Sequence, residues 1–330
     1  GPALVRLQGS GHVDLYYSMS EKCRLLDREE AWSPGGSILL STSLDAITWS
    51  KPRVVASQGA GVPQVTANPP VLWRDPKVEG RSTWLLPIWR ELPRKSACMF
   101  ESNSSDSAAV LHSLRWAECR DDDAEESCKC SHMHGEAACG HKWAVGGTLK
   151  HHRTWLIESS IVTFSDGLLL QLFRTTVGKV YRSLSHDGGV HWTAPEATSL
   201  PNPNSKVHAL VLSNGLLAVC YNAHTHRDIK DGVRSFLSVA ISVDRGQTWD
   251  IVAELETAQK PEGTDYRPMF HYPTMYQRGC TLFIVYTVSF NVAGTIPVFS
   301  AQNPTPSHLQ TGIRIAKIDM RLYDANNPTV

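Results

Sequence analysis

Short runs of apolar residues, separated by Gly, Asp, Asn and Pro, recur along the whole 330-residue chain. They are rich in β-branched and aromatic side chains, which favours strands over helices. Gly-containing turns at 165–167 and 213–215 each separate two runs, as in a β-hairpin, because glycine readily takes a positive φ. No amphipathic stretch is long enough to predict a helix, so the predicted fold class is all-β. The clearest runs are 13–18, 84–89, 168–173, 209–212, 236–241 and 282–286.

A turn motif occurs twice in intact form and once in degenerate form. The template Ser-x-Asp-x-Gly-x-x-Trp describes residues 185–192 and 242–249, whereas 43–49 lacks the glycine and is one residue shorter. We expect the Asp carboxylate to accept backbone N–H groups across a tight turn, the Gly to relieve the backbone and the Trp to pack beneath. The motif therefore predicts repeated hairpin turns, which is a structural role.

These repeats resemble the Asp boxes of the sialidase superfamily, in its BNR-repeat-like branch, and the resemblance covers about residues 1–320. It implies a sialidase-like β-propeller of four-stranded blades, followed by a C-terminal tail at 321–330. Members of the superfamily have six blades, so we expect one N-terminal blade to be missing from this chain, unless a five-bladed ring closes on itself. Five blade-sized units can be counted, at about 1–55, 64–116, 154–195, 206–252 and 268–320.

The charge balance narrows the classes of partner. The chain has 32 Lys and Arg against 32 Asp and Glu, whereas binding to nucleic acid or to an anionic membrane surface needs a basic excess. No apolar run approaches the length of a membrane span. We therefore predict no nucleic-acid partner and no membrane span. The sequon at 103–105 slightly favours a secretory or extracellular location, although the sequence leaves the compartment open.

Four residues match positions at which the sialidase superfamily places its chemistry. Glu158 matches the carboxylate that assists a nucleophilic tyrosine, and Tyr272 matches that tyrosine at the start of the final blade. Arg174 and Arg234 match two arginines that hold the substrate carboxylate, for which the planar guanidinium fork is suited. A phenol is a weak nucleophile until a neighbouring group takes its proton. Each residue also has a structural alternative: a surface or buried ion pair, a solvated charge or a packing aromatic.

Two parts of the family pattern are missing from the chain. There is no Arg-Ile-Pro motif for a first arginine and no matching acid/base Asp, so we do not expect this chain to work alone as a sialidase. Arg90, after a predicted strand, and Asn222 are further candidates for substrate binding, with a surface charge and a solvated loop as the alternatives. His224 and His226 are candidate acid/base groups for a propeller-type polysaccharide lyase.

A segment rich in cysteine and histidine, 117–150, is predicted to be an insertion between blades, longer than most packed connections. Thiolates and imidazoles are the ligands that zinc prefers, but their spacing matches no zinc motif that we can name. A disulfide-closed insertion or a plain loop are the alternatives. We expect this insertion, or the open propeller edge, to contact a protein partner. The weak metal-ligand candidates are Cys128, Cys130, His132, His134, Cys139 and His141.

The sequence thus predicts a sialidase-like glycoside hydrolase of the exo-α-sialidase type, acting on a terminal acidic sugar and incomplete in this chain. Its partner would be a carbohydrate or glycoconjugate, and the mechanism calls for no cofactor. A non-catalytic propeller that serves as a binding or structural subunit is the first alternative. A propeller-type polysaccharide lyase is the second.

Overall fold

The computed structural model describes residues 2–6, 11–19, 36–57, 64–90, 108–114, 142–225, 234–257, 266–292 and 311–323. These residues form strands and one short 3-10 helix, η1 (Met320–Leu322), with no α-helix among them. The all-β prediction is therefore confirmed. The described part of the chain holds no helix of the length and apolarity that a membrane crossing needs.

The strands form five antiparallel sheets, each built from consecutive segments of the chain. The first sheet contains β1 (Ala3–Arg6), β2 (Val13–Met19), β3 (Ser37–Ser43) and β4 (Arg53–Ala56). The second contains β5 (Gln64–Val65), β6 (Val71–Arg74), β7 (Ser82–Arg90), β8 (Ala108–Leu114) and β9 (Lys142–Leu149). The third contains β10 (Ile157–Thr163), β11 (Leu169–Arg174), β12 (Lys179–Ser185) and β13 (Glu196–Pro201). The fourth contains β14 (His208–Val211), β15 (Leu217–Tyr221), β16 (Leu237–Ser242) and β17 (Asp250–Glu256), and the fifth β18 (Tyr266–Arg278), β19 (Thr281–Val292) and β20 (Gly312–Asp319).

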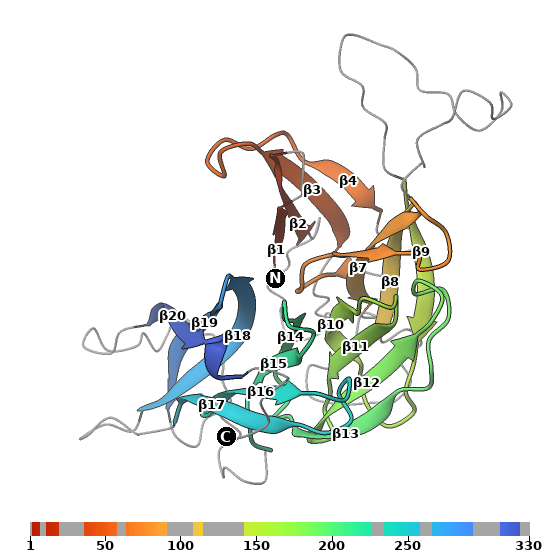
Figure 1. Cartoon of the computed structure of the whole chain (residues 1–330). Helices are drawn as coiled ribbons and strands as arrows, with labels where there is room; N and C mark the ends of the chain where they lie inside the picture. Colours follow the sequence, from red (N-terminus) through yellow and green to blue (C-terminus); the bar gives the residue numbers. More distant parts are fainter. Residues whose placement is uncertain are drawn as a thin grey trace, which may run out of the picture.

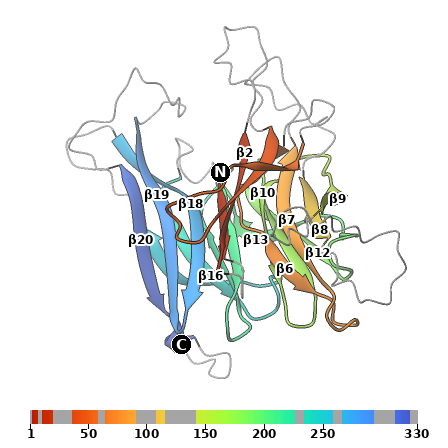
Figure 2. The ribbon, with the colours of Figure 1, turned by 90° about the horizontal axis from the view of Figure 1, so that it is seen from above.

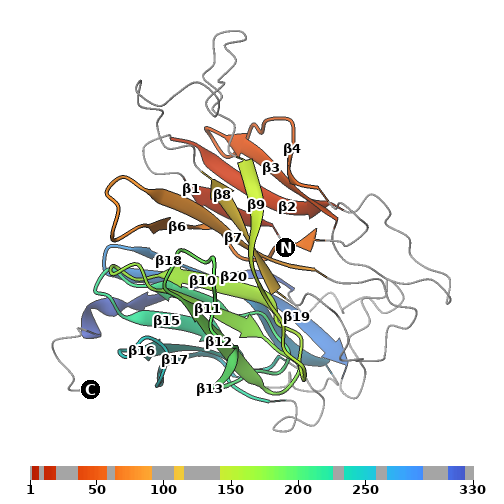
Figure 3. The ribbon, with the colours of Figure 1, turned by 90° about the vertical axis from the view of Figure 1, so that its right-hand side faces the viewer.

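The five sheets stand around a common axis as the blades of a β-propeller (Figure 1). In the third, fourth and fifth sheets the first strand lies nearest the axis, and β10 contacts β14, which contacts β18. Figure 2 shows β18, β19 and β20 side by side at one edge of the molecule. In Figure 3, β7 and β8 lie between the first sheet and the third, in chain order. The axis is therefore lined by strands that lie far apart in the sequence.

Apolar side chains fill the space between neighbouring sheets. Leu172 on β11 and Val219 on β15 are fully buried in the cluster between the third and fourth sheets. Val239 on β16 and Ile284 on β19 are fully buried in the cluster between the fourth and fifth. Side chains alternate between the faces of a strand, so each sheet offers an apolar face to its neighbour. The alternating runs predicted as strands supply these faces.

The Ser-x-Asp turns connect the third strand to the fourth in three of the sheets. After β12, the Ser185 hydroxyl donates to Asp187 Oδ1 at 2.9 Å, and the same oxygen accepts the His191 backbone N–H at 2.9 Å. Corresponding Ser–Asp bonds close the turn after β3, between Ser43 and Asp45 at 2.9 Å, and the turn after β16, between Ser242 and Asp244 at 2.7 Å. The carboxylate organises the turn, as the motif predicted.

The prediction that 117–150 is an insertion between blades is wrong at its C-terminal end. Residues Lys142–Leu149 form β9, which pairs with β8 and extends the second blade beyond its predicted end at 116. The paired glycines at 146–147 weakened the strand signal, but a Cβ on Gly147 would lie 2.5 Å from Cδ1 of Trp192. Glycine is needed there because the indole of the next blade packs against the backbone. Residues 117–141 lie outside the described residues.

Candidate active site

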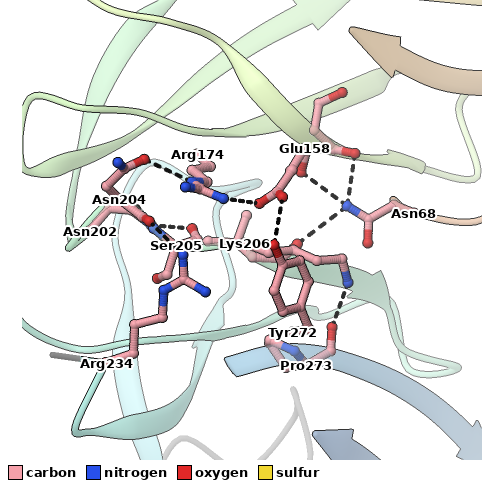
Figure 4. Close-up of polar contacts among 12 residues, drawn as sticks. Asn68, Glu158, Arg174, Asn202, Asn204, Ser205, Lys206, Arg234, Tyr272 and Pro273 are labelled. Carbon is pink, nitrogen blue, oxygen red and sulfur yellow. Dashed lines mark hydrogen bonds and ion pairs between the residues drawn. The ribbon is translucent and has the colours of Figure 1, made fainter. Parts of the chain in front are cut away.

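A cluster of polar side chains gathers near the axis, where segments of the last three sheets meet (Figure 4). We call it the polar cluster and define it by six residues. Glu158 is the second residue of β10, Arg174 is the last of β11, and Tyr272 lies within β18. The other three lie just ahead of β14 and β16: Asn204, Lys206 and Arg234.

Glu158 is the anion of the polar cluster. It is 5% exposed, and its Oε2 lies 2.7 Å from Nη1 of Arg174. Burial acts to raise the pKa of Glu158, but the charge and hydrogen bond of Arg174, with the charges of Arg234 and Lys206, outweigh burial and hold the pKa below its usual value. Burial likewise acts to lower the pKa of Arg174, and Glu158 reverses that effect. The pair is ionised at neutral pH.

Asn204 lies between the two arginines and orients both. Nε of Arg174 donates to its side-chain oxygen at 2.8 Å, and Nη2 of Arg234 donates to its backbone carbonyl at 3.2 Å. The Arg234 guanidinium also lies over the Tyr272 ring, 5.6 Å from the centroid. Burial and the charge of Arg174 lower the pKa of Arg234. Two like charges are thus held close together.

Tyr272 brings a phenol to this charged group. Its hydroxyl donates to Oε1 of Glu158 at 3.2 Å, so that the carboxylate binds Arg174 with one oxygen and the phenol with the other. Burial and the Glu158 charge raise the pKa of Tyr272, and the two arginines act against that rise. The residue as a whole is nevertheless 39% exposed, so part of Tyr272 faces solvent.

Glu158 and Tyr272 both sit where the backbone leaves the regular sheet. Their φ angles are +50° and +55°, in the left-handed region that L-residues with a Cβ rarely adopt. The β10–β11 register shifts between Ile157 and Ser160, and the β18–β19 register shifts between His271 and Thr274. Bulges of this kind re-aim a side chain. Here the two bulges turn the carboxylate and the phenol toward each other.

Two buried side chains fix these bulges from neighbouring segments. Nδ2 of Asn68, 1% exposed, donates to the carbonyls of Glu158 at 3.1 Å and Ser159 at 2.9 Å. Nζ of Lys206, 2% exposed, donates to the Pro273 carbonyl at 2.7 Å. Burial lowers the pKa of Lys206 to about 8, although the Glu158 charge acts against that shift. The backbone at both bulges is held by side chains (Figure 4).

Residues 1–285 match the family described as the BNR repeat-like domain. The chain belongs to this family. The match covers most of the chain, and with the five-sheet fold it confirms the prediction of a BNR repeat-like β-propeller. No curated protein sequence matches this BNR repeat-like chain.

Several solved structures share the fold of this BNR repeat-like chain at low identity. A leech intramolecular trans-sialidase is 11% identical, with a TM-score of 0.54, 88% of this chain covered and 37% of that one. An intramolecular trans-sialidase from Ruminococcus gnavus is 13% identical, with a TM-score of 0.49 and coverage of 76% and 45%. An exo-β-1,3-galactanase from Clostridium thermocellum is 8% identical, with a TM-score of 0.50 and coverage of 87% and 54%. The chain spans less than half the length of the two trans-sialidases, and the likenesses with TM-scores of 0.54 and 0.50 show the fold alone.

Of the residues singled out in the BNR repeat-like sequence, four meet in the polar cluster: Glu158, Arg174, Arg234 and Tyr272. The other two substrate-binding candidates are not among the six residues that define the polar cluster. Arg90 is the last residue of β7, paired with Gln64. Asn222 is fully buried, and its amide donates to the carbonyls of Phe236 at 2.7 Å and Phe270 at 2.9 Å. Its described bonds join β18 to the segment before β16, and a role in substrate binding stays a prediction for both residues.

The remaining candidates supply no site in the described structure. His224 is 4% exposed; its Nε2 accepts the Ser235 backbone N–H at 3.2 Å, and its Nδ1 lies 3.1 Å from the Thr225 carbonyl. Both nitrogens therefore bind the backbone. His226 and the six weak metal-ligand candidates of 117–150 lie outside the described residues. Within the described residues, no three side chains of His, Cys, Asp or Glu lie close enough together to hold a metal ion.

Sequence reasoning did not find three residues of this site: Asn68, Asn204 and Lys206. Asn204 directly follows the Asn-Pro step at 202–203, a pattern typical of a turn. Asn68 precedes two prolines, which is likewise typical of a turn or loop. A lysine directly before an apolar strand, as in Lys206-Val207-His208, was the one available signal. It indicates a buried cation only when the burial of the strand is known.

Proposed function

We propose that this chain is a glycoside hydrolase for a terminal acidic sugar, of the exo-α-sialidase type, with Tyr272 as nucleophile and Glu158 as its base. The observation that carries the proposal is the 3.2 Å hydrogen bond between the Tyr272 hydroxyl and the Glu158 carboxylate. Nucleophile and base within hydrogen-bond distance are the signature of covalent catalysis. Arg174 and Arg234 bind the carboxylate of the sugar.

The charge of the polar cluster supports an anionic ligand. Within its six residues, Arg174, Lys206 and Arg234 are cations and Glu158 is the one anion. Like charges taken out of water repel each other strongly unless a counter-charge joins them. A ligand carboxylate next to Arg174 and Arg234 supplies that counter-charge. A neutral phenol also avoids the repulsion that a carboxylate nucleophile would have with such a ligand.

A bound ligand carboxylate also makes Glu158 a better base. In the free protein the arginines hold the pKa of Glu158 low, which makes it a weak proton acceptor. A bound carboxylate shares those arginines, so the pKa of Glu158 rises and the Tyr272 proton moves to it more readily. The phenol oxygen then bonds to the anomeric carbon as the bond to the leaving oxygen breaks. Water then attacks the anomeric carbon as its bond to the Tyr272 oxygen breaks, and Glu158 returns the proton to the phenol. The proton lost by the water is released to bulk water, from which the departed leaving oxygen takes one.

The test is turnover of the 4-methylumbelliferyl glycoside of N-acetylneuraminic acid. This leaving group departs without a proton, so the assay does not require an acid/base Asp. Although the chain lacks two parts of the family pattern, we expect the wild type to release this activated fluorophore, and we expect Tyr272→Phe to lose at least about 100-fold in kcat. Tyr276→Phe is the matched control, because Tyr276 lies on the same strand and is 66% exposed; it keeps the wild-type rate. Full activity in Tyr272→Phe would overturn the proposed mechanism.

The substrate class has its own test. The corresponding glucuronide and galactoside present an acidic and a neutral sugar with the same leaving group. The proposal expects no galactoside turnover, because a neutral sugar leaves Arg174 and Arg234 without a counter-charge. Turnover of the galactoside alone would overturn the assignment to acidic sugars. Saturable binding of N-acetylneuraminic acid by calorimetry, without turnover of any glycoside, would identify a binding module instead.

A further inference from the structure

Lys206 is a buried cation to which the proposed reaction assigns no chemical step. It lies directly ahead of β14 and is 2% exposed, and its Nζ donates to the Pro273 carbonyl at 2.7 Å. Lysine is seldom buried this fully, because taking an ammonium group out of water costs several kcal/mol. A buried lysine with a single backbone partner in a neighbouring sheet therefore calls for an explanation.

The carbonyl that Lys206 binds belongs to the residue after Tyr272. At this point the pairing of β18 with β19 shifts register between His271 and Thr274, and Tyr272 takes a φ of +55°. A bulge takes backbone groups out of the ladder of hydrogen bonds, and a buried carbonyl needs another partner. The Lys206 ammonium group is that partner for Pro273.

The bulge that presents Glu158 is held in the same way. Asn68, from the segment between β5 and β6, donates to the Glu158 and Ser159 carbonyls. In both cases a side chain from another sheet binds the carbonyl at, or directly after, a residue with positive φ. Strained backbone persists only where the surroundings over-determine it.

We propose that Lys206 is a positioning residue, which holds the Tyr272 hydroxyl within hydrogen-bond distance of Glu158 by binding the Pro273 carbonyl. Its consequence for rate rests on the proposed function, whereas its geometry does not. The charged and titratable groups that interact with Lys206 are Glu158, His208 and Cys220. The amine donates hydrogen bonds in both its charged and its neutral form, so the positioning role needs only the N–H.

A spectroscopic test needs no substrate. Tyr272 is replaced by 3-fluorotyrosine, and the ¹⁹F resonance is recorded at neutral pH in three backgrounds: wild type, Lys206→Met and Lys179→Met. Lys179 is the matched control, because its Nζ also donates to a backbone carbonyl, that of Ser199 at 2.8 Å, but at an exposed position. We expect Lys206→Met to move the resonance toward that of the unfolded chain and Lys179→Met to leave it unchanged. An unchanged resonance in Lys206→Met would overturn the proposal.

Kinetics separate positioning from a general structural role. With the fluorogenic sialoside, we expect Lys206→Met to lower kcat about 100-fold, the effect of a displacement near 1 Å, and to change KM less than threefold because the arginines remain. In a Tyr272→Phe background the same substitution should change the residual rate less than threefold. Equal losses in both backgrounds would show that Lys206 does not act through Tyr272.

The two proposals fail in different ways. Wild-type activity in Tyr272→Phe would contradict the proposed function and leave the ¹⁹F result to decide the role of Lys206. An active wild type with an unchanged ¹⁹F resonance in Lys206→Met would contradict the positioning role alone. Circular dichroism checks that each variant is folded. If Lys206→Met does not fold, Lys206→Gln takes its place, and a resonance shift in the same direction is expected because the shorter side chain holds the carbonyl less well.

Discussion

Tyr272 and Glu158 are 114 residues apart in the sequence, and their side chains meet at 3.2 Å although both residues have a positive φ. A left-handed conformation costs a non-glycine residue about 1–3 kcal/mol. Both residues of this contact carry that strain. The buried amide of Asn68 holds one bulge, and the buried ammonium group of Lys206 holds the other. Strain concentrated in this way is typical of functional sites.

Removal of the anion should destabilise the polar cluster. Glu158→Gln leaves Arg174, Lys206 and Arg234 without a counter-charge, and we expect the free energy of unfolding to fall by about 3 kcal/mol. Urea denaturation measures this change. Glu196→Gln is the control, since Glu196 also binds an arginine, Arg182, at 2.7 Å but is 59% exposed; its loss should stay below about 1 kcal/mol. Equal losses in the two variants would contradict the picture of a buried charge cluster.

The burial of Lys206 predicts a stability difference that depends on pH. Its folded pKa of about 8 lies below the usual value for lysine, so between these two values the unfolded chain binds more protons and stability rises with pH. The burial penalty is fully present below pH 8 and is lost as the pH rises toward 10.5. Relative to wild type, Lys206→Met should therefore gain about 3 kcal/mol more at pH 7 than at pH 11. Urea denaturation at both pH values checks this, and a gain that grows with pH would refute it.

His208 should contribute to unfolding in acid. It is 4% exposed, and its Nδ1 accepts the Met275 backbone N–H at 3.2 Å. Burial and the Lys206 charge lower its pKa well below the usual value. The unfolded chain therefore binds a proton below about pH 6.5 that the folded chain does not. As the pH is lowered below that value, the free energy of unfolding decreases by up to about 1.4 kcal/mol per pH unit.

His208→Asn tests this prediction, because asparagine keeps an acceptor near the position of Nδ1 without a proton to gain. Unfolding free energies between pH 7 and pH 4.5 should fall less steeply in this variant than in wild type. His186→Asn, at an exposed position, should keep the wild-type slope. The same acid slope in all three proteins would exclude His208 as the cause.

Gly188 should be needed for contact between the second and third blades. It has a φ of +73°, and a Cβ there would lie 2.8 Å from the Trp73 ring. Gly215 has a φ of +86°, but its Cβ would meet nothing within 4 Å. Both alanine variants should lose about 1 kcal/mol from backbone strain, and Gly188→Ala about 1–3 kcal/mol more from overpacking. Thermal unfolding compares the stability of the two alanine variants. Similar melting temperatures would mean that the Trp73 ring moves aside for the Cβ at position 188 at little cost.

The sequence was sufficient for the fold class because its signals are local. Alternating runs and the turns at 165–167 and 213–215 predicted strands and hairpins that the structure contains. Strand β9 was missed for a long-range reason, since Gly147 makes room for Trp192 of another blade. A glycine pair looks like a strand breaker until its tertiary neighbour is known.

The residues of the site also fall into those with a local sequence signal and those without one. Glu158, Arg174, Arg234 and Tyr272 could be named because each matches a local family segment. Asn68 and Lys206 could not, because their partners are backbone carbonyls 90 and 67 residues away. Nothing in either sequence neighbourhood encodes those partners. Local chemistry can be read from a sequence, whereas the contacts that position it form only when several sheets pack together.

The polar cluster is shared among three consecutive sheets, β10–β13, β14–β17 and β18–β20, with Asn68 reaching in from the second. A single blade therefore carries a fragment of a site, and the full set of donors and acceptors exists only once these sheets have docked. Duplication or deletion of a blade between β10 and β20 would separate Glu158 from Tyr272, whereas exchange of the β1–β4 blade would leave their contact in place. The contact between Glu158 and Tyr272 therefore depends on the order of the sheets from β10 to β20 and not on the sheet of β1–β4.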